Sequence, residues 1–230
     1  HVLLICPAIV LYIYSNSLNL ISLQSLVNRR ICLFTYNQTV CDNLKNYTHY
    51  ADDIQQMSSQ TMIYLDVCFL VPAILSILFM ASVGDRRLDY ERPLHVSIAG
   101  SLLQSFVCIF ASLADMDHTA SLALLYAAQF VNGLLGGGSL CFISSCFSHI
   151  SMMHVNNNNQ NDNGEDSKKQ QQNRSIKYSI CEAFILIGQF LGSLTSGYLI
   201  GNRRDLKNFT RVFIVSFSLF LLVLIYTFLM

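Results

Sequence analysis

Two acidic residues stand inside long apolar stretches of this sequence and could carry proton chemistry. Glu182 lies in Tyr-Ser-Ile-Cys-Glu-Ala-Phe-Ile, and Asp66 lies in Tyr-Leu-Asp-Val-Cys. An ionisable group within a membrane costs roughly 2.5–3.5 kcal/mol near the bilayer centre and usually faces a cavity. Because desolvation favours the neutral form, such a carboxyl can gain and lose a proton during transport. The alternative is an ordinary interfacial carboxylate, with Glu182 reaching the headgroups and Asp66 near a helix end.

A third candidate is the charged stretch at residues 84–94, which contains Asp85, Arg86 and Arg92. It connects two apolar segments, so an acid beside clustered arginines could hold two helix ends together in one state of a conformational cycle. The alternative is a solvated charged turn. Its position between the second and third segments favours a gating role.

Paired glycines mark two apolar segments as close-packing helices. Gly133 and Gly137 stand four residues apart in one segment, and Gly188 and Gly192 do the same in another. Small residues at this spacing share one helix face and let two backbones approach closely. We expect helix packing to be their first role.

These residues lie in six long apolar segments. The chain of 230 residues is 53% hydrophobic and 12% charged, about half the charged fraction of an ordinary soluble domain. Each segment can cross a hydrocarbon core of roughly 30 Å as a helix of about 20 residues. The segments are expected to be helical because lipid cannot form hydrogen bonds with free backbone N–H and C=O groups. The sequence predicts an all-α membrane protein with six transmembrane helices, near residues 2–26, 61–83, 95–114, 121–148, 177–200 and 211–230.

The connecting segments predict an orientation. Residues 27–60 form a long polar loop with glycosylation sequons at Asn37 and Asn46, whereas residues 151–176 are rich in Asn and Gln and are expected to be disordered. Lys and Arg are shared equally between the two sides, so the positive-inside rule does not decide. The sequons favour an extracellular loop 27–60, with both chain ends and residues 151–176 in the cytoplasm.

Enzyme and cofactor signatures are missing from the sequence. It contains no HExxH, GxSxG or phosphate-binding loop, and no Cys/His spacing for zinc. Lys and Arg together number 14, as do Asp and Glu, so no charge excess indicates a nucleic-acid partner. We expect a protein that is not an enzyme, has no cofactor or metal, and has the lipid bilayer, a small solute and protons as partners.

Several stretches together resemble solute carrier family 46 of the major facilitator superfamily, which includes the proton-coupled folate transporter and its lysosomal relatives. The similarity covers nearly the whole chain. It is carried by residues 6–11 (CPAIVL), 28–32 (NRRIC), 36–44 (YNQTVCDNL), 65–66 (LD) with 71–73 (VPA), 85–93, 181–183 (CEA) and 196–198 (SGY).

The resemblance implies the N-terminal six-helix bundle of a twelve-helix fold. Residues 1–114 and 115–230 would be two inverted three-helix repeats, and the C-terminal bundle would be missing from a fragment. The solute path would lie between the two bundles, which rock in alternating access. Glu182 matches a membrane glutamate tied to proton coupling in the folate transporter.

The sequence departs from the family pattern in three places. In the superfamily motif G-x-x-x-D-R-x-G-R-R, Ala81 replaces the first Gly and Leu88 the second, and two extra residues precede Arg92. The fourth segment ends in Ser148-His-Ile-Ser without the Asp that relatives often have there. The Asn-rich insert at 156–173 is peculiar to this chain. These departures leave the substrate open.

The resemblance predicts a carrier, proton-coupled or facilitative, for an organic anion or folate-like solute, in the plasma membrane rather than the lysosomal membrane. The alternative is a multi-span protein that does not transport, such as a receptor, scaffold or degenerate paralogue. An extracellular loop 27–60 would allow a disulfide between Cys32 and Cys41. Cys41 could instead pair with a cysteine of the missing half.

Overall fold

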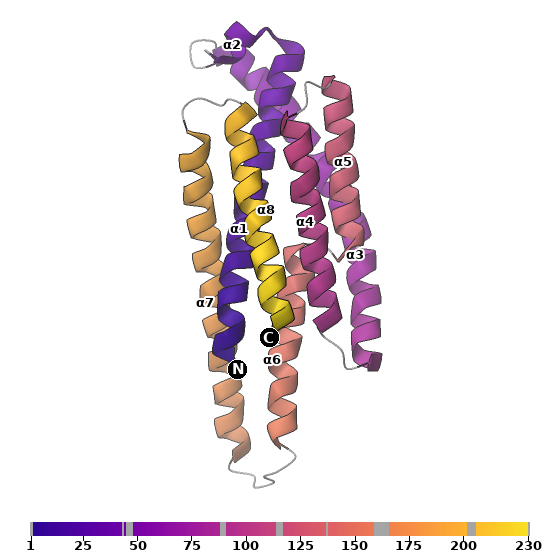
Figure 1. Cartoon of the computed structure of the whole chain (residues 1–230), viewed down its shortest axis with the longest axis vertical. Coiled ribbons are helices and arrows are strands. Elements are labelled where there is room, and N and C mark those ends of the chain that lie inside the picture. Colours follow the sequence, from indigo (N-terminus) through magenta and orange to yellow (C-terminus); the bar gives the residue numbers. More distant parts are fainter. Residues whose placement is uncertain are drawn as a thin grey trace.

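The computed structural model is a bundle of long helices, and the segments it describes contain no strand (Figure 1). The described residues are 2–42, 44, 48–87, 91–113, 117–136, 138–158, 166–201 and 206–229. The helices are α1 (Val2–Thr35), α2 (Gln38–Asp42), α3 (Thr48–Arg87), α4 (Glu91–Leu113), α5 (His118–Leu134), α6 (Ser139–Asn158), α7 (Asp166–Ile200) and α8 (Leu206–Leu229).

Six stretches of this bundle are long and apolar enough to cross a membrane. The fourth combines α5 and α6, and α2 is too short to take part. The predicted class, an all-α membrane protein with six spans, is therefore confirmed. The spans are Ile5–Thr35, His49–Met80, Arg92–Leu113, Thr119–Ser148, Ser175–Ile200 and Asn208–Leu229.

Helical structure extends beyond the apolar segments into the predicted loops. α1 continues to Thr35 and α3 begins at Thr48, so only part of the expected loop 27–60 remains between them. The backbone of 151–158 and 166–176 is also helical, within the stretch expected to be disordered, and residues 159–165 lie outside the described part. Lys and Gln have good helix propensity, so polar turns can prolong a span that membrane packing has already nucleated.

α1 is the central helix of the bundle. It packs most extensively on α7 and α8, and it also meets α3, α4, α5 and α6. The first span packs on the fifth through the α1–α7 contact, and the fourth span packs on the second through the α5–α3 contact. Two inverted repeats would pair the spans in this way, and the repeats stay a prediction.

Buried residues form two clusters at different levels of the bundle. The first gathers around Tyr12 and Phe142, whose rings stack at 3.8 Å, and includes Cys6 and Cys181. The second gathers around Leu23 with residues of α3, α4, α5 and α8. Short polar groups link the helices inside these clusters, as in the 2.8 Å hydrogen bond between the hydroxyls of Tyr12 and Ser101.

The helix ends alternate between the two ends of the bundle (Figure 1). α2, the last turns of α1, α4 and α7 and the first turns of α3, α5 and α8 lie at one end. The last turns of α3 and α6 and the first turns of α4 and α7 lie at the other, toward which both chain ends are directed. The described part of residues 27–60 therefore lies on the side opposite the end of α6 and the start of α7.

Candidate functional site

A glycine-rich turn breaks the fourth span near its middle. α5 ends at Leu134 and α6 begins at Ser139, where the sequence predicts one continuous helix over 121–148. Gly136 and Gly138 in the turn have φ of 109° and 55°, values that residues with a Cβ rarely adopt. α6 therefore starts inside the bundle instead of continuing α5.

α5 is fixed to its neighbours just before this break. A Cβ on Gly133 would collide with the backbone carbonyl of Phe69 on α3, so the two helices touch along their backbones. Asn132 Nδ2 donates a 2.6 Å hydrogen bond to Gln104 Oε1 on α4. Gly137, the predicted partner of Gly133, lies outside the described residues.

α6 leaves one face open. Its side chains at spacing i, i+3, i+4, i+7 and i+8 line a hollow of about 420 Å³, which Tyr178 of α7 completes. The rings of Phe147 and Tyr178 meet edge to face at 5.4 Å, while α6 and α7 otherwise touch little. We call this space the α6–α7 hollow; it is lined by Leu140, Ile143, Ser144, Phe147, Ser148 and Tyr178.

Glu182 lies one helical turn beyond Tyr178 on α7. Residues four apart share a helix flank, so Glu182 stands on the same flank of α7 as Tyr178, next to the residues that line the hollow and not among them. Its side chain is exposed, and within the described part of the chain no hydrogen bond or ion pair is found for it. The neighbouring Cys181 is buried against Cys6 of α1, which sets the level of Glu182 near the first turns of that helix.

Asp66 lies apart from Glu182. Its side chain is exposed on α3, and the preceding Leu65 is packed in the second core cluster, whereas Cys181 belongs to the first. The structure therefore places the two candidate carboxyls at different levels of the bundle. They do not form a pair.

The predicted gating residues lie around the α3–α4 connection. Asp85 and Arg86 are in the last turn of α3, and their side chains lie outside the described part of the structure. Arg92 is exposed in the first turn of α4. A gating contact between them stays a prediction.

Gly188 and Gly192 lie at the α7–α1 contact. An added Cβ would stand 2.9 Å from the carbonyl oxygen of Val10 at Gly188, and 2.6 Å from that of Tyr14 at Gly192. Such distances leave no room for a side chain without a shift of the helix. The two glycines therefore allow the close α1–α7 contact, which is the most extensive between the described helices.

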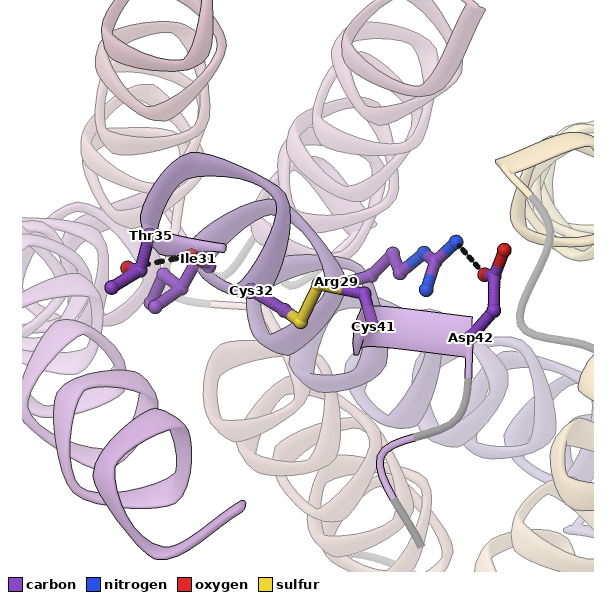
Figure 2. Close-up of a disulfide and its surroundings, with 6 residues drawn as sticks. All are labelled: Arg29, Ile31, Cys32, Thr35, Cys41 and Asp42. Atoms are coloured by element: carbon purple, nitrogen blue, oxygen red, sulfur yellow. Dashed lines mark hydrogen bonds and ion pairs between the residues drawn. A yellow bond between two sulfur atoms is a disulfide. The ribbon is translucent and has the colours of Figure 1, made fainter. Parts of the chain in front are cut away.

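A disulfide joins Cys32 at the end of α1 to Cys41 in α2 (Figure 2). Beside it, the guanidinium of Arg29 forms a 2.5 Å ion pair with Asp42, and Arg29 is buried whereas Asp42 is half exposed. The covalent link and the ion pair together hold α2 against α1. Of the two sequons in this region, Asn37 is exposed just before α2, and Asn46 lies outside the described residues.

The hollow was not predicted from the sequence. A signal was present, because Ser144 and Ser148 recur at helical spacing with Leu140, Ile143 and Phe147 and put two hydroxyls on an otherwise apolar face. That pattern does not by itself distinguish an open face from a packed one. Within the described residues, no group of three or more His, Cys, Asp or Glu side chains could hold a metal ion.

The fold and site define a six-span helical membrane protein with a carboxyl one helical turn from an open hollow. Its relatives are lysosomal proton-coupled steroid conjugate and bile acid symporters named SLC46A3. The chain is 26% identical over 204 residues to that of Rattus norvegicus, covering 84% of this chain and 40% of the relative. It is 25% identical over 212 residues to that of Homo sapiens, covering 86% and 41%.

These matches confirm the predicted resemblance: most of the chain is similar to members of solute carrier family 46, and six of its helical stretches are long and apolar enough to cross a membrane. The Gallus gallus symporter is 22% identical over 209 residues. The chain spans about 40% of the length of these curated relatives. No protein-family model and no solved structure matches it.

Proposed function

We propose that this chain is the N-terminal half of a proton-coupled carrier for an amphipathic organic anion. The observation that carries the proposal is the position of Glu182, exposed within the fifth span and one turn from the α6–α7 hollow. The names of the relatives support both a transported anion and a proton. They favour an anion with a steroid or bile acid skeleton over a folate-like solute.

Electrostatics would link the anion to the proton. A charged Glu182 would repel an anion about 6 Å away by on the order of 3 kcal/mol at an effective dielectric constant of about 20. Protonation of Glu182 removes this repulsion, so proton binding and anion binding favour each other. Other titratable groups on and beside this part of α7 are the ammonium of Lys177, the thiols of Cys181 and Cys6 and the hydroxyl of Tyr178.

The compartment and the second half are part of the proposal. The relatives are named lysosomal, which favours a lysosomal membrane over the plasma membrane expected from sequence. The complete carrier would need a second six-helix bundle, with the solute path between the two. Alternating access would then expose the hollow to one side at a time.

Uptake by the full-length protein in proteoliposomes tests the proposal. With taurocholate as the probe, Glu182→Gln should abolish most of the pH dependence of uptake, because the neutral amide imitates the protonated acid at every pH. Asp66→Asn tests the second candidate carboxyl, and Asp52→Asn, on an exposed position near the start of α3, is the matched control. Unchanged pH dependence in Glu182→Gln would remove this residue from the mechanism, and absence of any uptake would favour a protein that does not transport.

A further inference from the structure

We infer that the α6–α7 hollow is the subsite for the rigid fused-ring part of the transported anion, with Phe147 and Tyr178 as its specificity-determining residues. This inference rests on the proposed function. It adds a location for the ring system and a reason why a flat, rigid solute would be preferred.

The size and lining of the hollow fit such a group. Its volume of about 420 Å³ lies within the roughly 300–1,000 Å³ typical of small-molecule sites. Leu140, Ile143 and Phe147 supply an apolar wall, and aliphatic and aromatic side chains of this kind bury ring carbons favourably. A flat ring system buries this area with little loss of conformational entropy, whereas a flexible chain must be ordered first.

The polar groups of the hollow are few and are placed along one edge. Ser144 and Ser148 stand one turn apart on α6, so their hydroxyls can meet two hydroxyl or carbonyl groups of one rigid skeleton. Tyr178 adds a phenol on the facing helix, with its ring edge to face against Phe147 at 5.4 Å. The apolar wall and the hydroxyls of the hollow are complementary to a hydroxylated ring skeleton, which has one apolar face and one face that carries hydroxyl groups.

Charge fixes the direction of the bound anion. Glu182 lies on α7 one turn from Tyr178, toward the middle of the span, and Lys177 directly precedes Tyr178. Of the residues that line the hollow, none carries a formal charge. A ring system seated in the hollow therefore leaves its anionic group to these two side chains of α7. Lys177 would attract the anionic group, and Glu182 would repel it unless protonated, which joins ring recognition to proton coupling.

Two probes with the same head group separate ring recognition from anion recognition. Taurocholate carries the fused rings, and N-decanoyltaurine carries the same head group on a flexible chain. In the full-length protein, Phe147→Ala and Tyr178→Ala should raise the KM for taurocholate about tenfold and change that for N-decanoyltaurine less than twofold, with kcat little changed. Tyr178→Phe keeps the ring and removes only the phenol hydroxyl, so it should raise the KM for taurocholate less than Tyr178→Ala does.

The matched control is Phe190→Ala, which removes an aromatic ring from an exposed position of α7 outside the hollow. It should leave both KM values unchanged. Equal loss for both probes, or no loss in either aromatic variant, would overturn the subsite.

A direct label keeps the inference testable if uptake fails. A diazirine-bearing bile acid should label residues 140–148 or Tyr178 in the wild-type protein, and an excess of taurocholate should prevent the labelling. Labelling confined to other helices, or no protected labelling, would overturn the subsite. Protected labelling of the hollow without uptake would instead contradict the proposed transport and leave ring binding standing.

Discussion

The two halves of the fourth span meet their neighbours in different ways. α5 touches the backbone of α3 at Gly133. Polar groups of α5 form hydrogen bonds with α3 and α4, as in the 2.8 Å hydrogen bond that Ser76 of α3 donates to the carbonyl of Leu134. α6 buries Phe142 and Cys146 on one face and leaves the face with Ser144 open. One membrane span thus combines a fixed half with a half that has a free face.

The difference shows how the break creates a site. A continuous helix packed as α5 is would have carried the same close contact along its whole length. The turn between α5 and α6 contains two glycines with positive φ, Gly136 and Gly138, and the hollow lies between α6 and Tyr178 of α7. Among the described residues α6 and α7 make few contacts, so the side chains on this face of α6 are loosely packed.

The largest expected effect is at the fixed half. Gly133→Val should prevent folding or lower stability by about 3 kcal/mol or more, because its side chain would collide with the α3 backbone and overpacking at backbone contacts cannot relax cheaply. Yield and melting temperature of the detergent-purified full-length protein would measure this. Gly197→Val is the control, since a Cβ there meets nothing within 4 Å; equal losses in both would contradict the comparison.

A smaller effect is expected at the break itself. Gly138→Ala should cost about 1–2 kcal/mol through backbone conformation, since φ is 55° and the nearest atom to the new Cβ would be at an ordinary 3.4 Å. Gly138→Asn should recover part of this loss because Asn tolerates the left-handed region. A melting temperature unchanged by Gly138→Ala would mean that the turn is not needed in this form.

The hydrogen bond between Asn132 and Gln104 should contribute roughly 0.6–1.7 kcal/mol, the range found for polar contacts between membrane helices. A double-mutant cycle with Asn132→Leu and Gln104→Leu, read by the melting temperature, isolates the coupling between them. A coupling of zero would show that α5 is held by its glycine contact alone.

The smallest effect on stability is expected at the open face. Phe147→Ala should lower stability by about 1 kcal/mol or less, because its side chain is only partly buried. The same variant is expected to impair taurocholate binding strongly. A loss of several kcal/mol would instead identify Phe147 as a structural residue and would erase the contrast between α5 and α6.

Much of the fold could be predicted from local sequence. Six apolar segments predict six spans because lipid accommodates apolar side chains but cannot form hydrogen bonds with backbone N–H and C=O groups, which therefore pair within a helix. Both requirements depend only on the local sequence. The same local reading identified three further features: Glu182 within the fifth segment, the paired glycines at 188 and 192, and the two cysteines of the first connection. Helix ends were less predictable, because polar turns such as those up to Thr35 extend a span that is already stable.

The site itself depended on tertiary structure. Sequence by itself determined which residues lie in the membrane, since that depends on the hydrophobicity of each segment. The face of α6 that carries Ser144 is open or covered according to the direction of α6 after Gly138 and the distance between α6 and α7. Both depend on contacts between helices that are far apart in the chain. Only their packing brought Tyr178 of α7 against Phe147 of α6, one turn from Glu182.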